Sequence, residues 1–157
     1  MSVQLTVNGN VFDYPEPGEQ PGWGEDSTAW SEAVTEVLDS LANANDILQT
    51  EFLLTNNQTS AANVNGLLFS TASVRTATIE YTVYISTSTQ ELAESGTMIV
   101  TYKNTAATWG IAQLSHLDDS GVIFSITNSG QVQYTTTNIA GTGYSGKLTF
   151  KAKTLAQ

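Results

Sequence analysis

The sequence predicts a mainly β protein: an antiparallel β-sandwich or jelly-roll-like domain, preceded by an extended N-terminal arm and one α-helix. Three observations support this fold class. The three prolines all lie in the arm, the apolar residues that follow recur at helical spacing, and the apolar residues of the remaining chain alternate with polar ones, as in strands with one buried face. We therefore divide the chain into an arm (1–26), an amphipathic helix (27–47) and a β-sandwich domain (48–157).

The arm combines a short hairpin with a connector. Residues 3–14 alternate apolar and polar side chains around Asn8-Gly9, a pair that favours a tight turn between two strands. Residues 15–24, PEPGEQPGWG, contain prolines and glycines, which fix φ, remove backbone donors and interrupt regular structure. An extended connector is therefore expected between the hairpin and the helix.

The helix is expected over about residues 28–44, where Asp26 and Ser27 offer N-caps. Its apolar residues form a stripe wide enough to pack on a β-domain. Part of the stripe also fits a heptad that would bring copies together around an axis, and two heptads do not decide between these arrangements. The heptad residues are Trp30, Val34, Val37 and Leu41.

The β-domain is predicted to contain about eight antiparallel strands. In TIEYTVYIS, residues 78–86, the apolar side chains face one way and the polar side chains face the other. Turn pairs such as Ser95-Gly96, Ser120-Gly121 and Ser129-Gly130 separate several of the strands. The expected strands are 51–56, 64–69, 74–87, 94–103, 107–114, 121–127, 131–137 and 146–154.

Charge is low in total and unevenly distributed. Charged residues form 13% of the chain, against about 25% in typical soluble domains. Residues 1–74 contain ten acids and no Lys or Arg, which accounts for the net charge of −10. This acidity disfavours nucleic-acid binding and favours a basic docking surface; alternatively, the acids only keep the arm soluble. No membrane span and no secretory leader are expected.

Residue patterns typical of catalysis, metal binding or cofactor binding are weak. The chain has no cysteine. GTGYSG, residues 141–146, has the spacing of a dinucleotide-binding loop, but an alternating strand follows it, so a hairpin loop is the better interpretation. His116 lies in a segment that reads as a turn, without a catalytic motif, and no two carboxylates are marked as a catalytic pair. We therefore expect no enzyme activity, no metal and no cofactor.

Aromatic side chains remain as candidates for ligand contact. Most aromatics of the strands belong to apolar faces, which places them in the core. Tyr84 lies on the polar face of its strand and Tyr144 lies in the glycine-rich loop, so these two are the main candidate ligand contacts. Trp109 is a third candidate for stacking on a sugar ring.

Several short motifs resemble those of small virion structural proteins of tailed bacteriophages. They are YPEPG at residues 14–18, PGWG at 21–24, the helix segment WSEAVTEVLDSL and the ending GTGYSGKLTFKAKTL. The resemblance runs over most of the chain. It implies a trimeric decoration, head-fibre or tail-appendage protein, in which an N-terminal part attaches to the particle and a β-rich domain projects outward.

The resemblance and the residue patterns together predict a virion protein that is assembled in the host cytoplasm and lies on the particle surface. The leading hypothesis is a homotrimeric capsid decoration or head-fibre protein, bound to the major capsid protein or another virion protein. The alternative is a tail-associated receptor- or carbohydrate-binding module whose partner is a host-surface glycan. The expected attachment residues are Phe12, Tyr14 and Trp23, and the heptad residues of the helix are expected at the oligomer interface.

Overall fold

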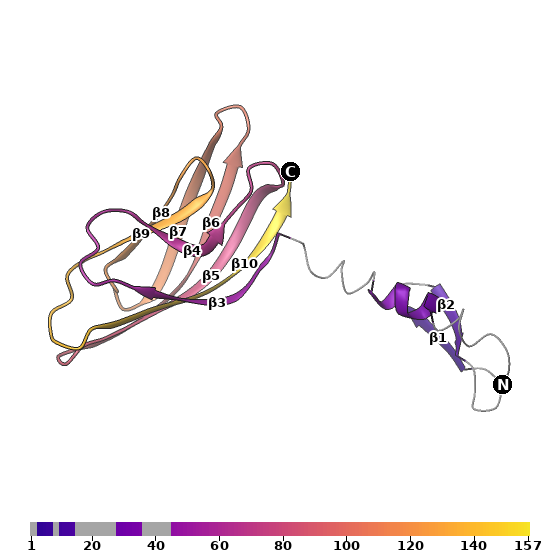
Figure 1. Ribbon diagram of the computed structural model, residues 1–157, viewed down its shortest axis with the longest axis horizontal. Helices are drawn as coiled ribbons and strands as arrows, with labels where there is room; N and C mark the ends of the chain where they lie inside the picture. Colours follow the sequence, from indigo (N-terminus) through magenta and orange to yellow (C-terminus); the bar gives the residue numbers. More distant parts are fainter. Residues whose placement is uncertain (1–2, 8–9, 15–27, 36–44) are drawn as a thin grey trace. The chain divides into compact units, whose positions relative to one another are not determined.

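The computed structural model of the protein describes residues 3–7, 10–14, 28–35 and 45–157. The chain divides into two compact units, Met1–Ala44 and Asn45–Gln157. The first unit contains a hairpin and a helix, and the second contains the other described strands (Figure 1).

The hairpin of the first unit is confirmed. β1 (Val3–Val7) and β2 (Asn10–Tyr14) pair antiparallel, from Val3 opposite Tyr14 to Val7 opposite Asn10. Residues 28–35 are helical, and the Ser31 hydroxyl donates a 2.9 Å hydrogen bond to the carbonyl of Thr28, one turn earlier. Such bonds satisfy a polar side chain within the helix itself.

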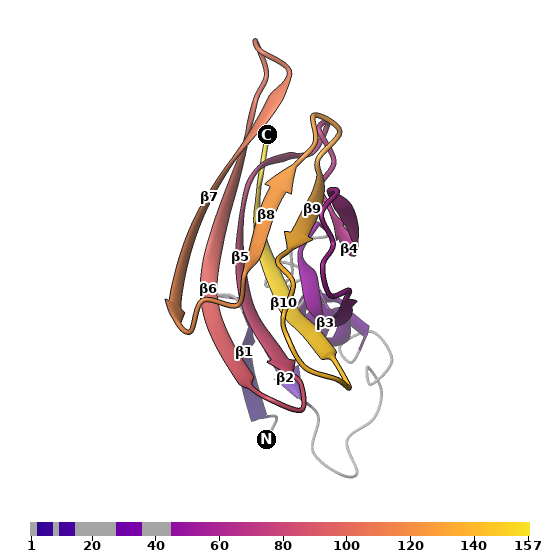
Figure 2. The same cartoon turned by 90° about the vertical axis from the view of Figure 1, so that its left-hand side faces the viewer.

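The second unit is a sandwich of two antiparallel sheets, as the alternating pattern predicts. The larger sheet has the strand order β3-β10-β5-β6-β7 and the smaller has the order β4-β9-β8 (Figures 1 and 2). The strands are β3 (Ile47–Leu54), β4 (Ala62–Leu68), β5 (Val74–Ser86), β6 (Glu91–Lys103), β7 (Thr108–Leu117), β8 (Val122–Ile126), β9 (Gln131–Thr136) and β10 (Ser145–Ala156).

The core lies between the two sheets. Along β5 the apolar residues Ile79, Tyr81, Val83 and Ile85 are buried, whereas the residues between them, Glu80, Thr82 and Tyr84, are exposed. Phe150 of β10, the strand between β3 and β5, is also buried. Burial of an aliphatic or aromatic side chain of this size contributes about 1.5–3 kcal/mol, so this alternation is the main source of the sandwich's stability.

The second unit begins with an acidic anchor. Asp46 accepts hydrogen bonds from the Thr154 backbone N–H at 2.7 Å and from Lys153 Nζ at 2.9 Å, so it ties the start of β3 to the end of β10. Burial alone would raise the pKa of Asp46, but the hydrogen bonds from Lys153 and Thr154 outweigh it and lower that pKa.

The prediction that the helix extends to residue 47 was wrong, because Ile47 already belongs to β3.

Three local expectations were wrong. Ser95-Gly96 is no turn but lies inside β6, where a Cβ on Gly96 would come within 2.7 Å of the Tyr81 ring. The turn before β6 instead contains Thr87, whose hydroxyl accepts a hydrogen bond from the Gln90 N–H, as serine and threonine side chains often do in turns. His116 belongs to β7, and the loop at 141–144 crosses between sheets rather than closing a hairpin.

Candidate functional site

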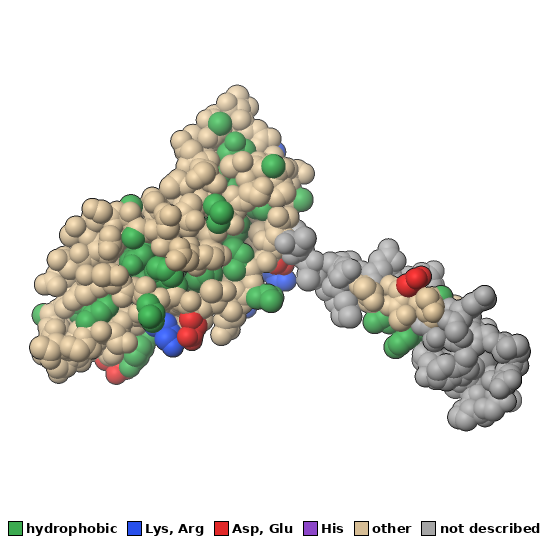
Figure 3. All heavy atoms as spheres, viewed as in Figure 1, with side chains coloured by type: hydrophobic (Ala, Val, Ile, Leu, Met, Phe, Trp, Pro, Cys, Tyr) green, Lys and Arg blue, Asp and Glu red, His purple; other side chains and the backbone are tan. Residues whose placement is uncertain are grey.

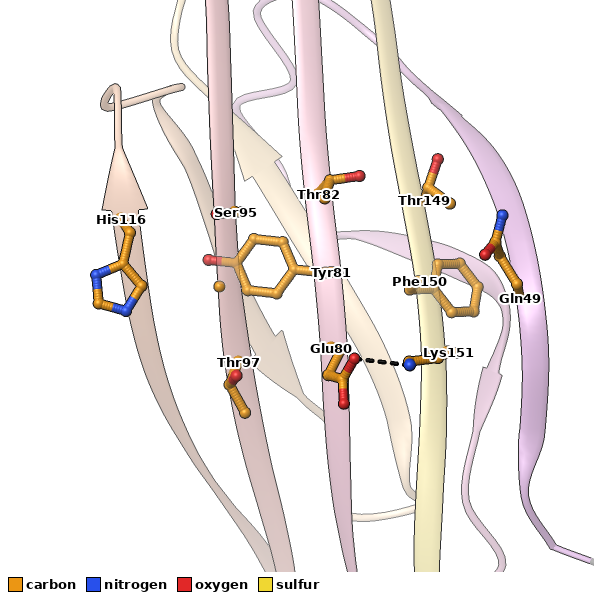
Figure 4. Close-up of a pocket in the computed structure, with 11 residues that line it drawn as sticks. Gln49, Glu80, Tyr81, Thr82, Ser95, Thr97, His116, Thr149, Phe150 and Lys151 are labelled. Carbon is orange, nitrogen blue, oxygen red and sulfur yellow. Dashed lines mark ion pairs between the residues drawn. The ribbon is translucent and has the colours of Figure 1, made fainter. Parts of the chain in front are cut away.

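A shallow hollow of about 640 Å³ lies on the outer face of the larger sheet (Figure 4). All five strands of that sheet contribute to it. Tyr81 and Phe150 border the hollow although their side chains belong to the core. The lining residues are Gln49, Glu80, Tyr81, Thr82, Ser95, Gly96, Thr97, His116, Thr149, Phe150 and Lys151.

Short side chains in two cross-strand rows create this hollow. Residues opposite each other on antiparallel strands point to the same face. The first row runs Thr149, Thr82, Ser95 and His116, and the second runs Lys151, Glu80, Thr97 and Leu114. Four of these eight residues are Thr or Ser, whereas the flanking positions of the same face include the larger side chains Tyr84 and Ile99, so the surface dips between them.

Ion pairs neutralise the lysines of this face. Lys151 Nζ lies 2.8 Å from Glu80 Oε2, inside the hollow (Figure 4). Lys147 and Lys153, the outward-pointing neighbours of Lys151 on β10, pair with Glu51 and Asp46 at 3.1 and 2.9 Å. Exposed pairs of this kind stabilise a fold by about 0–1 kcal/mol each, so their main effect is to neutralise the three lysines of this face.

The hollow therefore offers hydrogen-bonding groups without a strong local charge. Hydroxyls of Thr82, Ser95 and Thr149, the imidazole of His116 and the amide of Gln49 surround one ion pair. Such a set matches a neutral ligand that is rich in hydroxyl groups. In the part of the chain that the structure describes, no three His, Cys, Asp or Glu side chains gather to hold a metal ion.

Tyr84 lies beside this hollow, two positions along β5 from Thr82. Its side chain is 45% exposed, and its cross-strand neighbours are Lys147 and Ala93. A hydrogen bond to Glu91 raises the pKa of Tyr84. Of the aromatic residues singled out in the sequence, Tyr84 is the one that the fold brings to the edge of the hollow.

The other two candidate aromatics lie elsewhere. Trp109 is only 7% exposed and packs between Phe69 and Tyr102, with ring centroids 6.1 and 5.2 Å away, so the expectation that it stacks on a sugar was wrong. The Tyr144 ring packs against Gly146. Its hydroxyl is buried without a hydrogen-bond partner among the described residues, and burial raises its pKa, so that hydroxyl is not presented to a ligand.

The residues expected at the attachment and oligomer surfaces are only partly described. Trp30 and Val34 are half-buried on the helix at 28–35, whereas Thr28, Ser31 and Thr35 are exposed. The positions expected at these surfaces that lie outside the described residues are Trp23, Val37 and Leu41, together with the side chains of Phe12 and Tyr14. Attachment and oligomer contacts at these residues therefore stay predictions.

A buried polar cluster on the inner face of the larger sheet escaped the sequence analysis. Glu94 is 4% exposed, and it accepts hydrogen bonds from the Tyr81 hydroxyl at 2.7 Å and from the Ser120 N–H at 3.1 Å. Gln113 Nε2 donates to the Tyr81 hydroxyl at 2.9 Å. Burial, followed by the hydrogen bond to Glu94, raises the pKa of Tyr81. The cluster holds the connection between β7 and β8 against β6.

One sequence signal could have revealed this cluster. Glu94 is in phase with Met98 and Val100, the buried positions of β6, and a carboxylate at such a position must find hydrogen-bond donors. Ser120 and Tyr81 supply them, so the cluster is structural and offers no open site.

Comparison with known proteins gives little further information. No protein-family model and no curated protein match the chain. A solved structure, the tailspike protein of Acinetobacter phage vB_ApiP_P1, is similar with a TM-score of 0.43 and 16% sequence identity. The match covers 69% of this chain and 21% of the tailspike chain, so the chain spans about a fifth of that protein's length. A similarity this distant supports no conclusion about function.

No helix among the described residues has both the length and the apolar character needed to cross a membrane.

Proposed function

We propose that the chain is a structural protein of a bacteriophage virion, a capsid decoration or head-fibre protein attached through its first unit. The observation that carries the proposal is the unequal charge of the two units. Residues 1–44 contain eight acids and no Lys or Arg, whereas residues 45–157 contain seven acids and five bases. The first unit therefore has a net charge of −8 and the second a net charge of −2.

Such a division suits a protein with one attached end and one exposed end. A unit with a charge of −8 is drawn to a basic surface over a distance of about 10 Å at 0.1 M salt. The β-domain has few charged side chains on the face seen in Figure 3, where uncharged groups predominate. Electrostatic attraction to a partner therefore acts mainly on the first unit, which the resemblance also assigns to attachment.

The proposal predicts that charge in the first unit controls binding to particles. Replacing Glu16, Glu19 and Glu25 with Gln in the full chain should weaken binding to particles that lack the protein by about ten-fold or more, because each charge contributes up to about 1 kcal/mol. Co-sedimentation at 50 and 200 mM salt measures this, and the wild-type chain should also bind less at the higher salt concentration.

The matched control removes the same charge from the second unit. Replacing Glu51, Glu80 and Glu91, which are all exposed, with Gln should leave particle binding within about two-fold of the wild type. Equal losses in the two triple variants would show that only total charge matters and would refute attachment through residues 1–44.

We further propose that the protein is a homotrimer held by the helix. Trp30 and Val34 lie on the half-buried side of the helix at 28–35, and they occupy the first two positions of the heptad. Because large aromatic side chains contribute strongly to interfaces, Trp30 is the residue whose replacement should most reduce the mass of the assembly.

A tail-associated carbohydrate-binding module is the second candidate function, and the hollow on the larger sheet favours it. Threonine and serine hydroxyls form the floor of the hollow, and Tyr84 offers an exposed ring at its edge. Sugars are commonly bound by hydrogen bonds around an aromatic platform. In this function the outer face of the larger sheet would contact a host-surface glycan.

Carbohydrate binding predicts a specific loss at Tyr84. A glycan array with the full chain should give saturable binding, and Tyr84→Ala should weaken it by about ten-fold, equivalent to about 1.4 kcal/mol. Leu53→Ala is the control, because Leu53 is 73% exposed at the β3 edge of the same sheet and lies outside the hollow. If no glycan binds, this candidate is rejected and the decoration hypothesis is kept.

A further inference from the structure

The outer edge of β7 is a long strand edge without the usual protection. β7 pairs with β6 on one side and, among the described residues, with no strand on the other (Figure 2). Its ten residues, TWGIAQLSHL, contain no proline and no Asp, Glu, Lys or Arg. The pairing with β6 runs from Thr108 to Leu117 without a bulge. Such an edge offers unpaired backbone N–H and C=O groups to another strand.

The opposite edge of the same sheet is protected. β3 contains Glu51, which pairs with Lys147, and its register with β10 shifts between Phe150 and Ala152. Charged side chains and bulges are the devices by which proteins prevent edge-to-edge association. The contrast within one sheet singles out β7 as the edge that is open to a partner.

Apolar side chains accompany the open edge. Leu114 is 62% exposed on the outer face of β7, and Ile99, on the neighbouring strand β6, is 50% exposed. Ile99 lies opposite Ala112, so Ile99, Ala112 and Leu114 form a small apolar strip beside the edge. A partner strand would therefore gain apolar contacts as well as backbone hydrogen bonds.

We propose that the partner is β7 of a second copy of this chain, paired antiparallel about a twofold axis that joins copies from two of the proposed helix-held trimers. Antiparallel ladders are slightly more stable per residue than parallel ones, and a twofold contact uses one surface in both copies. With Gln113 of both copies on the axis, Leu114 of each copy lies opposite Ala112 of the other. The two apolar strips then meet at the centre of the contact.

Charge also favours the antiparallel direction. Asp118 and Asp119 directly follow β7, and Lys103 of β6 lies opposite Thr108 at its other end. Lys103 forms no ion pair among the described residues. Antiparallel pairing brings the acidic end of one β7 to the Thr108 end of the other, which is one strand away from Lys103. Parallel pairing would instead place the acidic ends of both copies together.

The absence of cysteine permits a direct test in the full chain. Gln113→Cys should form a disulfide-linked dimer under mild oxidation, because directly opposite residues of an antiparallel pair have Cα atoms about 4.5–5.5 Å apart, within disulfide range. Leu53→Cys, on the protected edge, is the matched control and should remain largely reduced.

A second variant tests the contact without altering Gln113, which bonds to Tyr81. Leu114→Lys places a charge at the centre of the contact and should at least halve the mass measured by sedimentation velocity. Leu53→Lys on β3 should sediment like the wild type.

Self-pairing is overturned if both lysine variants sediment like the wild type and Gln113→Cys cross-links no more than Leu53→Cys. It is also overturned if Leu114→Lys blocks incorporation into particles while the mass in solution stays unchanged, since the partner strand would then belong to another protein.

Discussion

Replacing Phe150 with alanine should lower the free energy of unfolding by about 3–5 kcal/mol. Phe150 is 1% exposed and lies on β10, which hydrogen bonds to both β3 and β5. Its ring also reaches the smaller sheet, where a Cβ built on Gly66 of β4 would lie 3.8 Å from Phe150 Cζ. The substitution therefore leaves a cavity between the sheets as well as removing apolar contacts.

Urea denaturation of the full chain measures the loss. The expected loss is a large part of the free energy of unfolding of a single domain, which is typically about 5–15 kcal/mol. Leu155→Ala is the control on the same strand, because Leu155 is 66% exposed and surface substitutions usually change stability by no more than about 0.5 kcal/mol. Similar losses for the two variants would contradict the assignment of Phe150 to a packed core.

Replacing Glu94 with alanine should lower the free energy of unfolding by about 2–4 kcal/mol. The variant leaves the hydroxyl of Tyr81 and two donors of Ser120, its N–H and its hydroxyl, without their acceptor in a buried place. Each buried unsatisfied group costs about 1–3 kcal/mol. The connection between β7 and β8 also loses its bonds from Ser120 to β6, so backbone amides near Ser120 should exchange hydrogen faster.

Thermal unfolding and hydrogen exchange of the full chain measure these two effects. Glu80→Ala is the matched control, because Glu80 is an exposed glutamate in the same sheet, paired with Lys151, and such a pair contributes about 0–1 kcal/mol. If Glu94→Ala is no less stable than Glu80→Ala, the buried cluster has no structural role. Glu94→Gln should lie between the two, since its amide keeps one acceptor oxygen.

The sheets could be predicted from the sequence because their pattern is set by burial. The alternation from Ile79 to Ile85 reports directly which face of β5 meets the core, and the Asn8-Gly9 pair between two apolar runs indicates the hairpin of β1 and β2. Both signals are local. They depend on the period of side chains along a strand and on the residues that a tight turn requires.

Strand ends and side-chain partners could not be predicted in the same way. β7 continues to Leu117 and β3 begins at Ile47 because strand pairing and the Asp46 anchor extend them, and both depend on residues distant in the sequence. The same limit applies to the candidate site. The outward position of Tyr84 follows from alternation, but the row of Thr149, Thr82, Ser95 and His116 exists only through the register of four strands.

The anchor at Asp46 also determines how the β-domain responds to mechanical force. A pull on the chain that enters through Asn45 meets the bonds from Asp46 to Thr154 and Lys153 before it reaches the first pair of the β3–β10 ladder. These bonds oppose the separation of β3 from β10 that would otherwise start at Ile47 and break the ladder one hydrogen bond at a time. Under the proposed attachment through residues 1–44, these bonds strengthen the β-domain at the end where a pull through the first unit would act first.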